Sequence, residues 1–226
     1  MFDPSAFSGR LPLFPLPDVV HFPHTLLPLH VFEPRYRTMV ADALAGERLI
    51  GMVLLKPGWE QEYGGNPAVH EIACLGRIAR VEVLDDGRYN LLLAGEARVR
   101  LDAVVSPLPY RTARVTVLPD RNDVDDWESR VPMAAELKDI FRQIYDGLTA
   151  AAGSPPLKSA KEYSLGNVVD MIAGTFDFDA PSKQGLLEEA DVPVRAARLM
   201  GMIRDLVRQR SRLPRSGEFP PRESEN

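Results

Sequence analysis

The sequence predicts an α+β fold in which a β-rich half precedes a helical half. Up to residue 119, short apolar runs and alternating apolar and polar residues are typical of strands. After that point, apolar residues recur at spacings of three and four, which is typical of amphipathic helices. The acidic, turn-rich segment Asp120–Glu128 separates the two patterns. We therefore expect a β-rich subdomain over residues 1–119, a helical subdomain over residues 120–213 and a disordered tail over residues 214–226.

The first two expected strands, Leu11–Leu16 and Leu26–Phe32, are interrupted by proline. Proline has no amide hydrogen to donate to a sheet, so such runs belong at sheet edges, strand starts or bulges. Pro34 suits the first turn of a helix, where the missing N–H costs nothing, and Gly46 is placed to end that helix. The apolar run Leu49–Leu55 then predicts a buried strand.

A series of strands with alternating side chains follows. Asp85-Asp86-Gly87 is a strong hairpin signal, and Gly95-Glu96 indicates a second turn or a bulge. Consecutive antiparallel strands at this spacing favour a meander that curls into a sandwich or barrel. The expected strands are Ile72–Leu84, Tyr89–Ala94, Ala97–Val105 and Tyr110–Leu118.

The helical half contains three apolar stripes and one short helix. The stripes run from Leu137 to Leu148, from Leu165 to Phe176 and from Ala196 to Val207. Several residues are suited to begin these helices: Ser159 with Glu162 has the spacing of a capping box, Pro181 can open the short helix through Glu189, and Asp191 can cap the last helix.

Composition and terminal sequence narrow the class of protein. The net charge of −5 gives no general attraction to phosphate backbones or anionic lipids, so we expect neither a nucleic-acid nor a membrane partner. The single cysteine, Cys74, cannot form an internal disulfide. The N-terminus lacks a signal peptide, and no stretch is apolar enough to span a bilayer, which favours a cytoplasmic location.

The sequence contains no recognisable catalytic constellation. A phosphate-binding P-loop, a GxGxxG motif and a GxSxG motif are all absent. His21 and His24 have a metal-ligand spacing, but Pro23 lies between them and no helix sets their geometry. Cys74 lies in an expected strand and is interpreted as a small buried hydrophobe. We therefore expect no catalytic residue, no metal and no cofactor.

Two features could serve binding. The loop Pro57–Pro67 carries Trp59 and Tyr63 among glycines, and exposed aromatic residues on a loop suit peptide capture. Alternatively, Trp59 folds back onto the core. The last helix is rich in arginine, which either complements the helix dipole and solvates the helix or forms a basic docking surface. Its arginines are Arg195, Arg198, Arg204, Arg208, Arg210 and Arg212.

The proline-punctuated opening resembles the signature of a known family. Leu11–Leu16, Phe22-Pro23 and Leu27–Tyr36 are similar to the start of the Lon protease N-terminal domain, also called the LON substrate-binding domain, a version of which occurs in cereblon. The resemblance covers about residues 10–210, although His24 stands where the family usually has glycine. The residues that carry the match, which we expect to be structural, are Phe14, Pro15, Pro28, Leu29, Phe32, Glu33, Pro34, Arg35, Tyr36, Gly76, Gly87 and Gly95.

This resemblance implies a PUA-like, antiparallel β pseudo-barrel with one short early helix, followed by a helical bundle. It also implies binding of unfolded or exposed polypeptide segments, with an incomplete barrel edge that could add a strand. The ATPase and serine–lysine peptidase modules of a full Lon protease are absent from this sequence, as in the stand-alone bacterial LON-domain proteins. We expect a non-catalytic polypeptide-binding module, an adaptor or regulator of proteolysis that could act with a separate protease.

Two alternatives stay open. PUA-like folds also bind RNA, although the acidic charge argues against it here. A hydrolase that uses Cys74 or the early histidines is the other alternative. The sequence predicts neither a client nor an oligomeric state.

Overall fold

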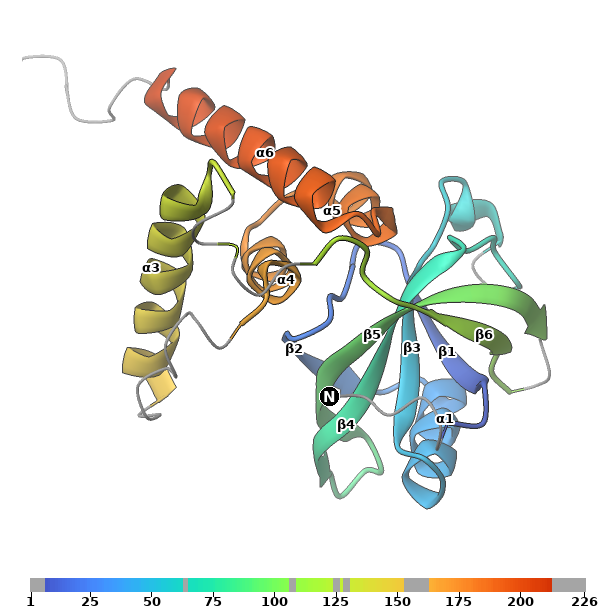
Figure 1. The fold of residues 1–226 in the computed structure, drawn as a ribbon. Coiled ribbons are helices and arrows are strands. Elements are labelled where there is room, and N and C mark those ends of the chain that lie inside the picture. The colour runs from blue at the N-terminus through green and yellow to red at the C-terminus, as the bar shows by residue number, and fades with distance from the viewer. Residues whose placement is uncertain are drawn as a thin grey trace, which may run out of the picture.

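The structure is a computed structural model that describes residues 7–62, 65–105, 109–123, 127, 131–152 and 163–212. The sheet has six strands. Figure 1 shows a helix beside this sheet and a group of helices at one end of it. The strands are β1 (Arg10–Leu16), β2 (Leu26–Val31), β3 (Leu49–Leu54), β4 (Ile72–Val83), β5 (Tyr89–Val105) and β6 (Thr112–Leu118). The helices are α1 (Pro34–Ala45), the 3₁₀ helix η2 (Trp59–Glu62), α3 (Ala134–Ala152), α4 (Leu165–Thr175), α5 (Ala180–Glu188) and α6 (Val192–Arg212).

The predicted α+β class is confirmed, since every strand precedes the group of four helices. We call β1–β6 with α1 the β lobe and α3–α6 the helical lobe. The strand order is β2-β5-β4-β3-β1-β6, and β5 pairs with β6 as well. The pairings therefore lead from β5 through β4, β3, β1 and β6 back to β5, so the sheet is bent around, whereas β2 stays outside this circuit. The predicted meander of β4, β5 and β6 is confirmed.

One part of the expected sheet is wrong: it is not antiparallel throughout. β1 and β3 run parallel, with Leu13 opposite Gly51 and Leu16 opposite Leu54. Parallel neighbours need a crossover connection, and β2 with α1 provides that connection between them. The prolines and apolar residues of each segment do not specify the direction in which β1 meets β3.

The two strands expected on either side of Gly95-Glu96 form one continuous strand, β5, with a bulge at this place. Leu75 lies opposite Ala97 and Gly76 opposite Gly95, so Glu96 is the extra residue. A glycine is needed here because the chain from Phe22 to Thr25 packs directly on it: Gly95 N–H donates to the Thr25 carbonyl at 2.9 Å. A Cβ on Gly95 would lie 2.0 Å from the Phe22 carbonyl oxygen.

Three clusters of buried side chains form the core. One lies between α1 and the sheet, around Met39, Val40 and Ile50. A second fills the inside of the sheet, around Leu13 and Leu75. The third holds the helical lobe together. Phe22, from the segment between β1 and β2, belongs to this third cluster, so the two lobes share apolar packing.

The expected starts of several helices are confirmed. Pro34 is the first residue of α1, and the Asp191 side chain accepts a hydrogen bond from Val194 N–H in α6. The helix α4 begins at a capping box formed by Ser164 and Asn167. The expected capping box at Ser159 and Glu162 lies outside the described residues, as does the tail over residues 214–226.

Candidate functional site

A small pocket opens where β1 ends and α1 begins, and we call it the α1 pocket. Its volume is about 40 Å³. Four of its residues belong to the family signature found in the sequence: Pro15, Glu33, Arg35 and Tyr36. The complete lining is Pro15, Leu16, Pro17, Glu33, Arg35, Tyr36, Leu55, Pro67 and Arg111.

The start of α1 is fixed against the end of β1. The Glu33 backbone is extended, and its carbonyl accepts hydrogen bonds from the N–H groups of Tyr36 and Arg37 at 3.0 and 2.9 Å. Pro34 pre-sets the first turn because its ring fixes φ near the helical value. The buried Tyr36 ring packs on Phe14 with 4.4 Å between ring centroids. The signature residues thereby bring β1 and α1 together at the pocket.

The lining of the α1 pocket carries more positive than negative charge. Arg35 donates from Nε to the Glu33 carboxylate at 2.9 Å, and its guanidinium lies 4.6 Å from the centre of the Tyr36 ring. Arg111 is only 9% exposed and donates from Nη1 to the Pro67 carbonyl at 2.7 Å. Among the described lining residues there are two guanidinium groups and one carboxylate.

The loop that contains Trp59 begins and ends at this pocket. Leu55 and Pro67, on either side of the loop, both line the pocket. The base of the loop is held by the Lys56 N–H, which donates to the Ala68 carbonyl at 2.8 Å. Trp59 begins the helix η2 and is half-buried. Its side chain is therefore neither fully exposed for binding nor fully folded back onto the core. Tyr63, the other expected aromatic contact, lies outside the described residues.

A second surface of interest is β2, which pairs with β5 alone among the described strands. Leu26 is 62% exposed at its start, and Phe32 is 59% exposed just after its end. Pro28 and His30 between them are also exposed, and His30 Nδ1 lies 2.7 Å from Asn90 Oδ1 on β5. The surface of β2 therefore combines exposed apolar side chains with one polar pair, His30 and Asn90. Leu29, the remaining signature residue of this strand, is half-buried.

The remaining signature glycines lie where a side chain would collide with a neighbour or where φ is positive. A Cβ on Gly76 would lie 2.6 Å from the Leu93 side chain, so this position on β4 has no room for one. Gly87, in the hairpin between β4 and β5, has a φ of 76°, which glycine adopts readily.

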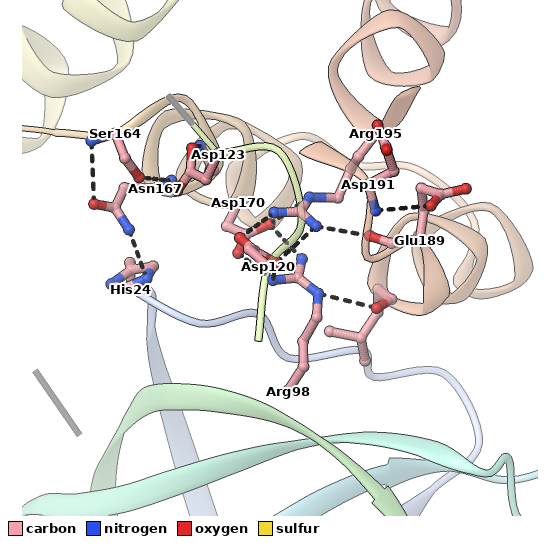
Figure 2. Close-up of polar contacts among 12 residues, drawn as sticks. His24, Arg98, Asp120, Asp123, Ser164, Asn167, Asp170, Glu189, Asp191 and Arg195 are labelled. Atoms are coloured by element: carbon pink, nitrogen blue, oxygen red, sulfur yellow. Dashed lines mark hydrogen bonds and ion pairs between the residues drawn. The ribbon is translucent and has the colours of Figure 1, made fainter. Parts of the chain in front are cut away.

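A buried ionic network joins the two lobes, and sequence reasoning missed it (Figure 2). Arg98 of β5 donates to both carboxylate oxygens of Asp170 of α4, at 2.7 and 2.5 Å. Arg195 of α6 donates to Asp120 at 2.6 Å and lies 3.2 Å from Asp170. Burial alone would lower the pKa of Arg98, but the Asp170 carboxylate outweighs it and raises that pKa, so the guanidinium stays charged.

This network balances two guanidinium groups against two carboxylates, which is an arrangement suited to holding the lobes together. The sequence places Asp120 in an acidic, turn-rich segment and Arg195 in the arginine-rich last helix. Arg195 is instead fully buried. The four residues are far apart in the chain, and no local pattern signals that they meet.

His24 links the lobes a second way. Its φ is 62°, in the left-handed region that glycine favours, which agrees with glycine being usual at this place in the family. The Asn167 side chain donates to His24 Nε2 at 2.7 Å, and Asn167 also forms the capping box of α4 (Figure 2). The histidine thus keeps the turn and adds a contact to the helical lobe. Burial lowers the pKa of His24.

Two of the groups considered for catalysis, Cys74 and His21, are buried. Cys74 is fully buried, and burial raises the pKa of its thiol far above the ordinary value, so the reactive thiolate is not formed. Burial lowers the pKa of His21 to about 4. Across the described ranges, no three histidine, cysteine or acidic side chains gather as metal ligands do. Within the same ranges, no helix has the length and hydropathy to cross a membrane.

The arginines of α6 make contacts within the helical lobe. Arg204 pairs with Glu136 of α3 at 2.6 Å, and Arg198 donates to the Gly185 carbonyl of α5 at 3.0 Å. Arg208 pairs with Asp205 one turn earlier at 3.3 Å. The first two contacts link α6 to α3 and α5, and the third lies within α6. The side chains of Arg210 and Arg212 lie outside the description.

The fold is shared with solved structures of Lon N-terminal domains. A Lon N-terminal domain protein from Xanthomonas campestris superposes with a TM-score of 0.61 at 24% identity, covering 85% of this chain and 97% of that one. The N-terminal domain of Mycobacterium avium complex Lon protease superposes with a TM-score of 0.62 at 18% identity, covering 87% and 98%. These likenesses define the class of fold.

Comparison of the sequence with known proteins identifies the family of this chain. Residues 10–205 match the model of the ATP-dependent protease La (LON) substrate-binding domain, and the chain belongs to this family. It is 28% identical to a Lon protease of Anaeromyxobacter dehalogenans over 195 residues, which is 85% of this chain and 23% of that protein. It is 29% identical to a Lon protease of Flavobacterium johnsoniae over 184 residues, 78% of this chain and 22% of that protein. The chain thus spans less than a quarter of these relatives.

Proposed function

We propose that this protein is a non-catalytic, cytoplasmic module that binds exposed segments of unfolded polypeptide and acts as an adaptor or regulator of a separate protease. The observation that carries this proposal is the match to the substrate-binding domain of Lon over residues 10–205. The inaccessibility of Cys74 and His21 supports the non-catalytic part.

In this proposal, the client segment lies across the mouth of the α1 pocket. The two ends of the Trp59 loop, Leu55 and Pro67, line the pocket, so we expect Trp59 to supply aromatic contact area for the client, as we expect of Tyr63 from the sequence. The apolar wall formed by Pro15, Leu16 and Leu55 gives a client side chain a surface on which to pack. The free edge of β2 is a second place where an extended segment could pair.

The test is binding of a denatured, fluorescently labelled client, such as reduced and carboxymethylated lactalbumin, measured by anisotropy. We expect saturable binding by the unmodified chain. Trp59→Ala should weaken it about tenfold, which corresponds to the loss of about 1.4 kcal/mol of contact free energy. The matched control is Val207→Ala, which truncates an exposed apolar side chain on α6 and should leave affinity unchanged.

Absence of binding by the unmodified chain would refute the proposed function. Equal affinity of Trp59→Ala and the unmodified chain would remove only the loop from the binding surface. The adaptor role is tested separately by adding this protein to a purified protease with the same client and measuring the rate of degradation.

A further inference from the structure

We infer that the contact between His24 and Asn167 is a pH-sensitive latch between the two lobes, closed when the His24 ring is neutral and open when the ring binds a second proton. The latch joins the segment between β1 and β2 to the first turn of α4. It is a regulatory feature of the fold and does not depend on the proposed function.

The start of α4 holds the side-chain amide of Asn167 in one orientation. The amide oxygen accepts a hydrogen bond from the Ser164 N–H at 3.3 Å, and the Ser164 hydroxyl accepts one from the Asn167 N–H at 3.3 Å. These two bonds form the capping box of the helix. The amide nitrogen of Asn167 therefore points away from Ser164 and toward His24, as Figure 2 shows.

This orientation determines which protons the His24 ring can carry. The amide nitrogen of Asn167 is a donor without acceptor capacity, and it lies 2.7 Å from His24 Nε2. Nε2 must therefore accept, which requires the neutral ring with its proton on Nδ1. In the charged ring both nitrogens carry protons, so Nε2 would present an N–H to an NH₂ group. Protonation thus breaks the contact, unless the amide turns over and gives up its bond to Ser164.

The surroundings of His24 disfavour the charged ring at neutral pH. Desolvation is the largest influence and lowers the pKa of His24. The carboxylates of Asp170 in α4 and of Asp120 and Asp123 after β6 act in the opposite direction, whereas the guanidinium of Arg98 in β5 lowers the pKa further. The histidine is exposed on its outer side, so protons from solvent can reach the ring.

The lowered pKa sets the direction of the latch. In the unfolded chain the ring titrates near its ordinary pKa of 6.5, and in the folded protein it titrates at lower pH. The unfolded chain therefore binds the proton first as the pH falls. The stabilisation from the closed latch is complete above pH 6.5 and is lost as the pH falls through the pKa of the folded protein.

The decisive variant exchanges the donor that faces His24 for an acceptor. Asn167→Asp keeps one oxygen for the Ser164 N–H and places a second carboxylate oxygen against Nε2. A protonated ring can then donate to this carboxylate, so the variant should raise the pKa of His24 above 6.5, whereas it lies below 6.5 in the unmodified chain. The pKa is measured from the nuclear magnetic resonance signals of the ring carbons, and His24→Gly identifies which signals belong to His24.

Ser164→Asp is the matched control for the added charge. It introduces the same negative charge at the start of the same helix, and aspartate caps a helix as well as serine does. Because Asn167 still donates to His24 in this variant, the pKa of His24 should stay below 6.5. Circular dichroism checks that both variants are folded. A pKa of 6.5 or higher in the unmodified chain would overturn the inference, and so would an equal rise in the two variants.

The pH dependence of stability gives a second readout. The free energy of unfolding of the unmodified chain is compared with that of His24→Gly by urea denaturation at pH 7.5 and pH 5.5, so that the other titrating groups contribute equally to both. The advantage of histidine over glycine should shrink at pH 5.5. In an Asn167→Asp background the same advantage should grow at pH 5.5, because a ring with a raised pKa stabilises the fold in its charged form. A change in the same direction in both backgrounds would refute the latch.

Discussion

At position 95, the backbone that packs against the strand leaves room only for glycine. A Cβ at this position would collide with the Phe22 carbonyl at 2.0 Å, and a backbone atom cannot move aside as a side chain can. Gly95→Ala should therefore lower the free energy of unfolding by about 2 kcal/mol or more, measured by urea denaturation. Gly201→Ala is the control, since nothing lies within 4 Å of its Cβ position in α6. It should stabilise by about 0.5–1 kcal/mol, and equal effects of the two changes would contradict this account.

His21 predicts a pH dependence of stability. Burial lowers its pKa from 6.5 to about 4 in the folded protein. Between these values the unfolded chain binds the proton and the folded protein does not, so stability is complete above pH 6.5 and is lost as the pH falls toward 4. From pH 7.5 to pH 5 we expect a loss of about 2 kcal/mol from this residue. Urea denaturation at both pH values should show that extra loss in the unmodified chain and not in His21→Gln; identical pH dependence would refute it.

At the scale of elements, α4 depends on its first turn. Ser164 accepts a hydrogen bond from the Asn167 N–H, and the Asn167 side chain accepts one from the Ser164 N–H. Ser164→Ala should lower the free energy of unfolding by about 1 kcal/mol. Thr38→Ala is a suitable comparison, because the Thr38 hydroxyl donates to the Pro34 carbonyl on the exposed side of α1 and starts no helix. Its effect should stay within about 0.5 kcal/mol, and chemical denaturation of both variants checks the difference.

Most elements follow from local patterns. The prolines of β2 and α1 lie where an edge strand and the first helical turn tolerate a missing N–H. The expectation of a sheet edge does not hold for β1, which pairs with β3 over Leu13–Leu16 and with β6 over Arg10–Pro12. Alternation in β6 and the apolar stripe of α4 predict their faces. The pairing of strands depends less on local sequence. Gly95-Glu96 indicates a turn or a bulge equally well, and only the register against Leu75 and Gly76 shows that β5 continues through it.

At the scale of the whole molecule, the ionic network of Arg98, Asp120, Asp170 and Arg195 connects the lobes. Asp170→Ala leaves two buried guanidinium groups without their shared partner. We expect it to lower the free energy of unfolding by about 3–5 kcal/mol, since removing one member leaves buried charge uncompensated. Asp205→Ala, which breaks an exposed pair in α6, should change it by less than about 1 kcal/mol.

The same variant tests whether the network couples the lobes. Trp127 is fully buried in the cluster of the helical lobe, so its fluorescence reports on that lobe in a Trp59→Phe background. In that background, tryptophan fluorescence and far-ultraviolet circular dichroism should give one coincident urea transition. Adding Asp170→Ala should separate them, with fluorescence changing at the lower urea concentration. Transitions that remain coincident would show that apolar packing around Phe22 couples the lobes without the network.

Some residues of the candidate site can be recognised from local sequence, whereas others can be recognised only from the tertiary structure. Trp59 and the signature residues of α1 are visible in the sequence because each belongs to a short motif. Arg111 is not, since it lies in no motif, and its place in the α1 pocket depends on the Pro67 carbonyl, 44 residues away along the chain.

By itself, the sequence determined the α+β order, the positions of most strands and helices and the family signature, because these depend on the side-chain periodicity and turn chemistry of neighbouring residues. The tertiary structure alone decided that β1 and β3 run parallel, that Arg98 and Arg195 meet Asp170, and that Arg35 and Arg111 share one pocket. These features arise when distant segments pack together, and packing selects among pairings that local patterns leave equivalent.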